Sequence, residues 1–502
     1  MKAAEQPSRV PATNPASRTQ ATAGRRWRVS LPSLRLTTSE RRWMLALIDV
    51  LVLNVALLVA LALRYDYALS WSTLFEAPVY FLLLTLLWFV WASFFDCYDL
   101  PRTADGSQSA WSTGRAALLT ALTYLAIPYF TPHFPTSRLS AYMFVSLATL
   151  SVSAWRLLYA SVFSQPTFQQ RLLIVGAGQS GSELARELAG TPRYGNPYAG
   201  SGYAVVGFID DDPAKGSAEV EGVPVLGNRY DLRRLVEELE VDILVLAITH
   251  TPQIHPTLFR SILECRERGI RVVPMSSLYE RLTGKVPVVH AGRNLHVVLP
   301  LSDLPMQRLF WAVKRLFDLF ASLVGLLVLG LVIPWVTLAN AIWSRGPLLY
   351  WQARVGKGGK HFQLLKLRTM VPDAEQDSGA VWARENDERI TPLGRFLRIS
   401  RLDELPQCWN ILKGEMSLVG PRPERPEFIA ELAQEVPFYQ ARHAVRPGIT
   451  GWAQVRYGYG SSVQDALVKL QYDLYYIKHQ SVYLELSILV KTVAVMLGLR
   501  GR

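Results

Sequence analysis

Residues 319–344 read L-F-A-S-L-V-G-L-L-V-L-G-L-V-I-P-W-V-T-L-A-N-A-I-W-S, a stretch of 26 positions without a charged side chain. As a helix it would be about 39 Å long, enough to cross the ~30 Å hydrocarbon core of a bilayer. Pro334 lies inside it, and an internal proline breaks or kinks a helix. Lys314 and Arg345 flank it, so both ends are typical of a cytoplasmic face. A re-entrant membrane helix-break-helix over 306–345 is favoured over a kinked full span.

Four further apolar stretches lie upstream, and each is about long enough to span a bilayer as a helix. They cover about 43–63, 77–95, 114–130 and 139–163. They predict a membrane protein with a four-helix transmembrane bundle over 43–165; a buried soluble bundle is the alternative. Asp49 and Arg156 lie toward helix ends, where we expect them to reach the interface.

The net charge of +12 on 502 residues is unevenly distributed. Residues 1–42 carry nine Lys or Arg and two Glu, whereas 345–502 carry 22 basic and 16 acidic residues. The first block predicts a disordered basic tail in the cytoplasm. The mean hydropathy of +0.15 indicates membrane segments. The basic residues at both ends of the chain fit an anionic membrane surface. No nucleic-acid partner is expected, because no recognised reader motif is present.

Residues 166–305 alternate between strand-like and helix-like patterns, which predicts an α/β Rossmann-like cytosolic domain with a doubly wound parallel sheet. After a short apolar strand come Gly176, Gly178 and Gly181 in the spacing G-x-G-x-x-G. A strand before such a loop and a helix after it are what dinucleotide binding requires. Nucleotide binding and a purely structural use of the glycines both remain open.

The acid that a dinucleotide site needs at the end of its second strand would be one of the three aspartates 210–212. They lie later than the usual spacing of roughly 20 residues after the loop. No Tyr in the chain is followed by Lys four residues later. The common catalytic pair of short-chain sugar-nucleotide dehydrogenases and epimerases is therefore absent.

The densest polar motifs lie between residues 366 and 476. They are K-L-R-T-M at 366–370, D-E-L-P-Q at 403–407, S-L-V-G-P-R-P at 417–423, P-G-I-T-G at 447–451 and Y-D-L-Y-Y at 472–476. Arg and Lys suit phosphate oxygens, glycine-rich turns can cradle anions, and adjacent carboxylates can bind Mg²⁺ or act as a nucleophile. Any one stretch could be a surface charge run. Together, next to a membrane-dipping helix, they indicate a diphosphate substrate at a membrane face.

With L-R-I-S-R-L-D-E-L-P-Q at 397–407 and K-R-L-F-D at 314–318, residues 308–502 closely resemble the bacterial sugar transferase family, the monotopic phosphoglycosyl transferases. The whole chain resembles its large subgroup, which initiates exopolysaccharide or O-antigen synthesis. The resemblance implies an α/β catalytic module over 346–502, ending in an interfacial helix at about 483–499; a core helix there is the alternative. It also implies a multi-pass protein of the bacterial inner membrane, with its catalytic domain on the cytoplasmic face, and a homodimer.

The activity that the resemblance implies is transfer of hexose-1-phosphate from a UDP-hexose, with glucose or galactose as the sugar, to undecaprenyl phosphate. Asp403 would attack the sugar-bearing phosphate and release UMP, and Glu404 would bind Mg²⁺ and assist the acceptor step. Arg398 and Arg422 match family positions, and the resemblance implies that they bind the phosphates of the substrate. Further candidates for binding phosphate are Lys366, Arg368 and Arg354.

The helix break departs from some relatives, which place Ser before the internal proline. This chain has Ile333, so the break relies on Pro334 alone or on donors such as Thr337 or Asn340. Two other function classes stay in view. A membrane-anchored NAD-dependent nucleotide-sugar enzyme would use the glycine-rich loop but leaves the C-terminal motifs unexplained. A non-catalytic scaffold is disfavoured because the chain keeps both adjacent carboxylates.

Overall fold

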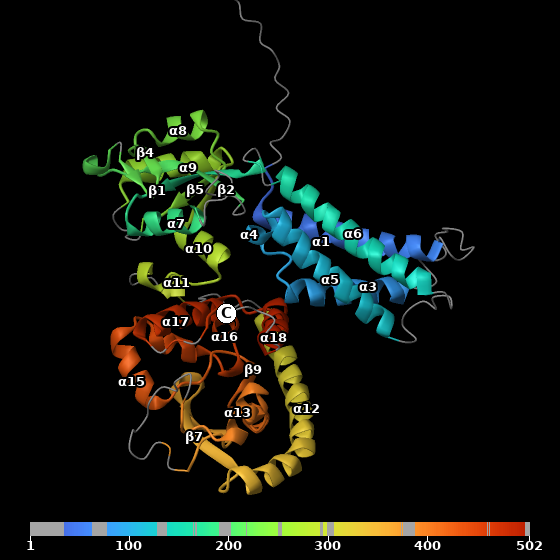
Figure 1. The fold of residues 1–502 in the computed structure, drawn as a ribbon. Coiled ribbons are helices and arrows are strands. Elements are labelled where there is room, and N and C mark those ends of the chain that lie inside the picture. The colour runs from blue at the N-terminus through green and yellow to red at the C-terminus, as the bar shows by residue number, and fades with distance from the viewer. Residues whose placement is uncertain are drawn as a thin grey trace, which may run out of the picture. The chain divides into compact units, whose positions relative to one another are not determined.

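The protein is described from a computed structural model, drawn as a ribbon in Figure 1. It describes residues 35–62, 78–127, 138–163, 165, 168–189, 202–216, 218–248, 254–291, 295–298, 306–372, 374, 387–458, 460 and 462–496. Most of the predicted basic tail, residues 1–34, lies outside these ranges.

Helices occupy the described part of each of the four predicted N-terminal stretches. The helices are α1 (Thr38–Ala62), α3 (Pro78–Phe94), the one-turn α4 (Leu100–Thr103), α5 (Gly106–Ala126) and α6 (Arg138–Phe163). The long helices share one apolar core, to which α1, α3, α5 and α6 contribute Leu53, Trp88, Ala117 and Phe144. Both α1 and α6 are long and apolar enough to cross a membrane, and α3 is a shorter apolar helix of 17 residues.

Two charged residues lie inside this helical core, and the expectation that they reach the interface is wrong. Asp49 of α1 and Arg156 of α6 are fully buried and form an ion pair. The Arg156 guanidinium also lies 5.4 Å from the ring centroid of Tyr98. Because an unpaired charge in an apolar core costs far more than a paired one, the two residues share one buried site.

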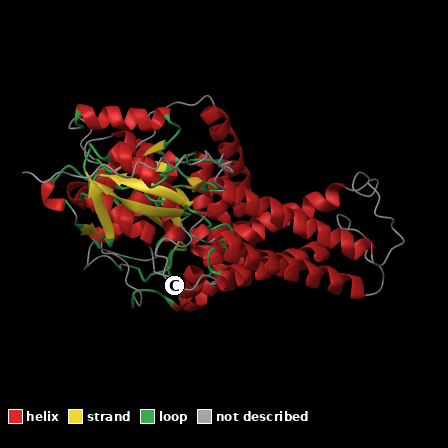
Figure 2. Ribbon diagram, turned by 90° about the horizontal axis from the view of Figure 1, so that it is seen from above, coloured by secondary structure: helices red, strands yellow, loops and turns green. Residues whose placement is uncertain are grey.

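The predicted Rossmann-like domain is confirmed as a doubly wound sheet. Its strands are β1 (Gln170–Val175), β2 (Tyr203–Ile209), β3 (Glu219–Val220), β4 (Val223–Gly227), β5 (Ile243–Leu246) and β6 (Arg271–Pro274). The order is β3-β4-β2-β1-β5-β6, and the described pairs are parallel apart from β3 with β4. Figure 2 shows the strands side by side among helices. The apolar run of β1 is buried, as a strand covered on both faces must be.

Helices cover both faces of this sheet (Figure 1). One face packs against α7 (Gln179–Ala189) and α10 (Met275–Thr283), the other against α8 (Leu232–Glu238) and α9 (Pro256–Glu267). The chain leaves this domain before the predicted boundary at residue 305. Val286, Val288 and Val298 belong instead to the main core of the C-terminal module, because these side chains find apolar partners there.

The apolar stretch around Pro334 forms α12 (Met306–Trp343), a helix that continues through Pro334 and is long and apolar enough to cross a membrane. Figure 1 shows α12 bending in its C-terminal part. The interruption predicted from the sequence is thus a bend within one continuous helix. Thr337 Oγ1 donates to the Ile333 carbonyl at 2.8 Å, and Asn340 Nδ2 donates to the Gly346 carbonyl beyond the helix end. The Thr337 bond lies next to the proline, which lacks an N–H, whereas the Asn340 bond lies at the end of the helix.

The C-terminal module contains two small sheets and several helices. The antiparallel pair is β7 (Leu349–Val355) with β8 (His361–Leu367), and the parallel pair is β9 (Ser417–Val419) with β10 (Gly448–Thr450). The helices are α13 (Pro392–Ile399), α14 (Gln407–Lys413), α15 (Pro426–Glu435), α16 (Trp452–Arg456), α17 (Val463–Lys478) and α18 (Val482–Met496). In α18, Leu484 and Ile488 are core residues, whereas Tyr483 and Leu486 are exposed. This helix therefore combines a core face with an outward apolar face.

Candidate active site

The two adjacent carboxylates lie in one short turn. Asp403 and Glu404 end the 3₁₀ helix Leu402–Glu404, between α13 and α14. Arg401 enters the turn with φ = +56°, a left-handed conformation that is costly for a residue with a side chain. Although the two acids are consecutive, both are buried: Asp403 is 7% exposed and Glu404 is 9% exposed. Such strain and such buried charge are both typical of functional sites.

Glu404 is held by two cations that the sequence singled out. Arg422 Nη2 lies 3.2 Å and Lys366 Nζ 3.7 Å from the same carboxylate oxygen, Oε1. Burial by itself would raise the pKa of Glu404, but Arg422, Lys366 and Arg401 together outweigh it and lower the pKa. Glu404 is therefore an anion at neutral pH.

Asp403 has a different environment. Its Oδ1 is buried and has no hydrogen-bond partner among the described residues. Burial raises the pKa of Asp403, and the nearby positive charge of Lys366 opposes the rise. A buried carboxylate oxygen without a partner is uncommon and calls for a functional explanation. Poor solvation also leaves this oxygen available to attack an electrophile.

Lys366 reaches the carboxylates from β8, and a side chain of α14 fixes that strand. Asn410 Oδ1 accepts from the Leu365 N–H at 3.1 Å, and Asn410 Nδ2 donates to the Gln363 carbonyl at 2.7 Å. Asn410 thus bonds to β8 as a neighbouring strand would. Because α14 follows directly after the acidic turn, this contact sets the position of Lys366 relative to Glu404 and Asp403.

The motifs S-L-V-G-P-R-P and P-G-I-T-G pack against each other through their backbones. The Gly420 N–H donates to Thr450 and the Gly448 N–H donates to Pro421, both at 2.9 Å. A Cβ at position 448 would lie 2.1 Å from the Gly420 nitrogen. The expectation that these turns present N–H groups to an anion is therefore wrong for Gly420 and Gly448. Close backbone contact explains the glycines, and it positions Arg422.

The other predicted phosphate ligands have separate partners. Arg398 Nε donates to Thr369 Oγ1 at 2.9 Å, and its charge acts on Asp403. Arg354 donates to the Pro423 carbonyl at 3.0 Å, next to Arg422. Arg368 is buried and its guanidinium is directed to the end of α12, where its partners are Pro347 O, Asn340 Oδ1 and Ser344 O. Its contacts are those of a structural residue, so the structure does not bring Arg368 to the carboxylates.

The sequence reasoning missed Arg442, which lies in the 3₁₀ helix Tyr439–Ala444. This buried guanidinium donates to the Arg422 carbonyl at 3.0 Å and to Asp473 Oδ2 at 2.9 Å. A single arginine outside any glycine- or acid-rich motif cannot be told from a surface arginine. The only available signal was Asp473, a carboxylate inside the apolar run Y-D-L-Y-Y, which implies a buried cationic partner.

The K-R-L-F-D motif anchors α12 to the same site. Lys314 Nζ donates to the Val419 carbonyl at 3.1 Å and to Glu485 at 2.6 Å. Asp318 accepts from the Ser417 hydroxyl and the Leu418 N–H. All of these partners except Glu485 are in the strand that leads to Arg422. The motif therefore joins α12 to the turn that carries Arg422.

In the Rossmann-like domain, two of the three glycines in the glycine-rich loop have a structural reason. A Cβ at position 181 would lie 2.1 Å from the Gly176 carbonyl oxygen, and Gly176 has φ = +108°. Around Gly178 a Cβ would meet no described atom within 4 Å. Asp210, the first candidate acid, accepts from the Ala177 N–H at 2.7 Å and from Lys215 at 3.3 Å. These contacts favour a structural use of Gly176 and Gly181, whereas no close contact explains Gly178.

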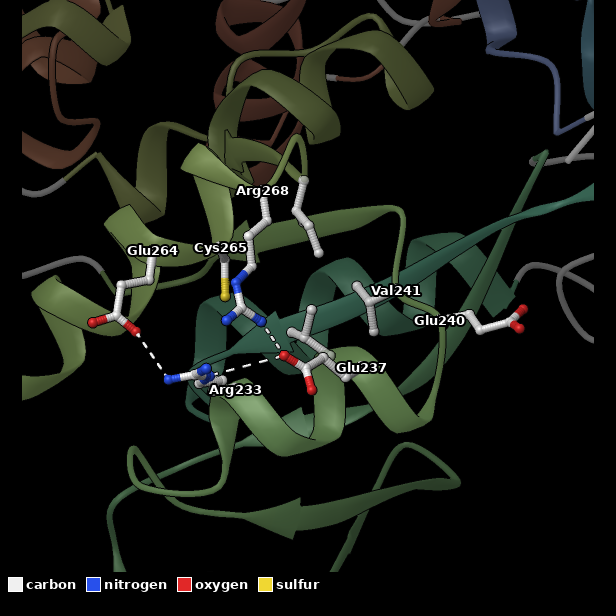
Figure 3. Close-up of a pocket in the computed structure, with 9 residues that line it drawn as sticks. Arg233, Glu237, Glu240, Val241, Glu264, Cys265 and Arg268 are labelled. Carbon is white, nitrogen blue, oxygen red and sulfur yellow. Dashed lines mark hydrogen bonds and ion pairs between the residues drawn. The ribbon is translucent and has the colours of Figure 1, made fainter. Parts of the chain in front are cut away.

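A groove of about 270 Å³ lies between α8 and α9 of this domain (Figure 3). Figure 3 shows Arg233, Glu237, Glu264 and Arg268 linked in ion pairs at its rim. Glu240 pairs with Arg35. Because each charged lining residue already has an ionic partner, we assign no ligand to this groove.

Comparison with known proteins agrees with this geometry. Residues 309–498 match the bacterial sugar transferase family, and residues 93–260 match a CoA-binding domain. Similar to this chain is the UDP-N-acetylgalactosamine-undecaprenyl-phosphate N-acetylgalactosaminephosphotransferase of Aeromonas hydrophila, 38% identical over 47% of this chain and 55% of that protein.

Two glucose transferases are also similar. The undecaprenyl-phosphate glucose phosphotransferase of Komagataeibacter xylinus is 33% identical over 66% of this chain and 60% of its own length. The UDP-glucose:undecaprenyl-phosphate glucose-1-phosphate transferase of Xanthomonas campestris pv. campestris is 30% identical over 66% and 67%, respectively. The alignments thus span between about half and two thirds of these relatives. With this similarity and with the acidic turn in which Arg422 meets Glu404, the chain belongs to the bacterial sugar transferase family.

Proposed function

We propose that this protein transfers hexose-1-phosphate from a UDP-sugar to undecaprenyl phosphate and releases UMP, the first step of an exopolysaccharide or O-antigen. The observation that carries the proposal is Asp403: a buried carboxylate whose Oδ1 has no partner among the described residues, close to the cations that bind Glu404. Glucose and galactose are the first candidate sugars. The relatives' names support the lipid acceptor and the nucleotide-sugar donor.

In the first step, an oxygen of Asp403 forms a bond to the sugar-bearing phosphorus. The bond from that phosphorus to the bridging oxygen breaks, and UMP leaves with the electron pair. No proton has to be removed from the nucleophile, since a carboxylate is ionised at neutral pH. Arg422 and Lys366 lie where they can offset the negative charge that grows on the departing phosphate.

In the second step, a phosphate oxygen of undecaprenyl phosphate attacks the same phosphorus. Asp403 leaves as a carboxylate, and the lipid diphosphate-sugar forms. One acyl phosphate and then one diphosphate replace the original diphosphate bond, so no other energy source is needed. Splitting the transfer lets a soluble donor and a lipid acceptor use one site in turn.

Mg²⁺ is part of this proposal, and Glu404 would hold it. Among the described residues no group of three or more His, Cys, Asp or Glu could form a metal site. This suits Mg²⁺, which keeps several waters and binds one or two carboxylates together with substrate phosphates. The carboxylate of Glu404 is ionised at neutral pH, as a ligand of Mg²⁺ must be. When bound, the ion would neutralise diphosphate charge.

We also propose the placement of the chain in the bacterial inner membrane. In this arrangement α1, α3, α5 and α6 cross the bilayer as a four-helix bundle, α12 enters and leaves on the cytoplasmic face at its bend, and two copies form a homodimer. Support comes from the apolar character of α1, α6 and α12 and from the basic residues on both sides of α12. The acidic turn then lies at the surface where a lipid phosphate is found.

The test is UMP release by the purified protein from a panel of UDP-sugars, with undecaprenyl phosphate and Mg²⁺. We expect UMP with at least one hexose donor, together with a lipid diphosphate-sugar. Consumption of NAD with no UMP would instead support the nucleotide-sugar enzyme. Failure to release UMP from any donor, in the presence of acceptor and Mg²⁺, would refute the proposed function.

A further inference from the structure

Three consecutive backbone carbonyls in the G-P-R-P turn each accept from a different part of the module. Pro421 O accepts from the Gly448 N–H, and Pro423 O accepts from Arg354. Between them, Arg422 O accepts from Arg442 Nη2 at 3.0 Å. The backbone on both sides of the Arg422 side chain is therefore fixed from three directions.

Arg442 is the donor that reaches Arg422 itself. Its guanidinium is 6% exposed, and the same Nη2 donates to Asp473 Oδ2 of α17 at 2.9 Å. Nη1 donates to the Tyr439 hydroxyl at 2.7 Å. Nη2 serves the first two of these acceptors and Nη1 serves the third, so the planar fork reaches all three at once, whereas the single nitrogen of a lysine cannot occupy both positions. Arg442 thus joins α17 to the turn that carries Arg422.

The position of the Arg422 backbone matters because it determines whether the side chain can reach Glu404. Arg422 Nη2 lies 3.2 Å from Glu404 Oε1, and 34% of the side chain remains exposed. A long, half-exposed arginine loses rotamer freedom when it is held in one place. An error of about 1 Å in the placement of such a group can cost on the order of 100-fold in rate.

We propose that Arg442 is a positioning residue for the transfer reaction: by binding the Arg422 carbonyl, it holds the Arg422 guanidinium against Glu404, where it meets the donor diphosphate. The inference rests on the proposed function. It goes beyond that function because Arg442 touches neither carboxylate of the acidic turn in the described contacts and acts through Arg422. The competing explanation is that Arg442 only neutralises the buried Asp473.

Arg442→Lys separates these explanations. A lysine keeps a positive charge for Asp473, but its nitrogen ends about one bond short of the Nη2 atom that binds Arg422 O. Steady-state UMP release is measured for Arg442→Lys, Arg422→Gln and the double variant. We expect Arg442→Lys to lower kcat/KM about tenfold when Arg422 is present and less than twofold when Arg422→Gln is present, because residues that act as a unit are not additive. An equal loss in both backgrounds, or no loss in either, would overturn the proposal.

Arg315→Lys is the matched control. Arg315 also donates to two backbone carbonyls of the module, Ile411 O and Leu412 O, but not to Arg422. Its effect should be the same fold-change with and without Arg422→Gln. Should Arg442→Lys not fold, as judged by thermal unfolding, Arg442→Met/Asp473→Leu removes both buried charges together. The same cycle then applies to it, with the same expected non-additivity.

If the wild-type protein releases no UMP, the proposed function is refuted. If the wild type is active and Arg442→Lys combines additively with Arg422→Gln, only the positioning role of Arg442 is refuted.

Discussion

We expect kcat/KM of the transfer reaction to fall at alkaline pH, because the Lys366 ammonium loses its proton there. Burial, reinforced by the charge of Arg422, lowers the pKa of Lys366 to about 8. Below this pH the ammonium is present beside Glu404, and the charge is lost as the pH rises through 8. If catalysis needs the ammonium, kcat/KM is half its plateau near pH 8 and roughly a tenth of it at pH 9, because one pH unit is tenfold in the proton equilibrium.

The assay is kcat/KM for UMP release between pH 6 and pH 10, since this ratio reports groups of the substrate-free enzyme. Lys366→Arg should move the alkaline limb above pH 10, because a guanidinium keeps its proton throughout this range. The control is Lys360→Arg, at an exposed lysine on the neighbouring turn, and it should leave the limb near pH 8. A wild-type profile that is flat to pH 9.5, or an alkaline limb that stays near pH 8 in Lys366→Arg, would show that the Lys366 ammonium does not set the limit.

Two further predictions concern the attachment of α12. Lys314→Met removes the ionic partner of the buried Glu485, which keeps the neutral Tyr476 hydroxyl at 2.6 Å, and should lower the free energy of unfolding by about 3 kcal/mol. Lys314→Met/Glu485→Leu should recover most of this in thermal unfolding, and a double variant no better than the single one would disprove the anchor. At Gly325, a Cβ would lie 2.4 Å from Cys408 Sγ, so Gly325→Val should cost about 1–3 kcal/mol by overpacking. Cys408→Ala should restore stability to Gly325→Val, and an equally unstable double variant would contradict the close contact.

The elements that follow a simple pattern could be predicted from the sequence. The long apolar stretches are helices in the structure. The alternating strand-like and helix-like patterns after residue 170 form a mainly parallel sheet that is covered on both faces. Asp403, Glu404, Lys366 and Arg422 could be named in advance because they stand in dense motifs, and the structure brings these four together.

What could not be predicted are the partners chosen across long sequence separations. Arg368 and Arg422 look alike as basic residues in conspicuous motifs, yet one holds the end of α12 and the other holds Glu404. Asp49 and Arg156 are 107 positions apart, and only the packing of α1 on α6 makes them a pair. Glycines suit both anion binding and close backbone approach, so the role of Gly448 depended on which chain lay beside it.

The most direct test of the central claim is the mass of the intact protein after incubation with UDP-sugar and Mg²⁺ in the absence of undecaprenyl phosphate. The account predicts that the protein gains one hexose phosphate on Asp403, with one equivalent of UMP released, and that adding undecaprenyl phosphate removes the added mass. Asp403→Asn should gain no mass and release no UMP. An active wild-type enzyme that never carries the phosphosugar, or an Asp403→Asn variant with full activity, would contradict the account.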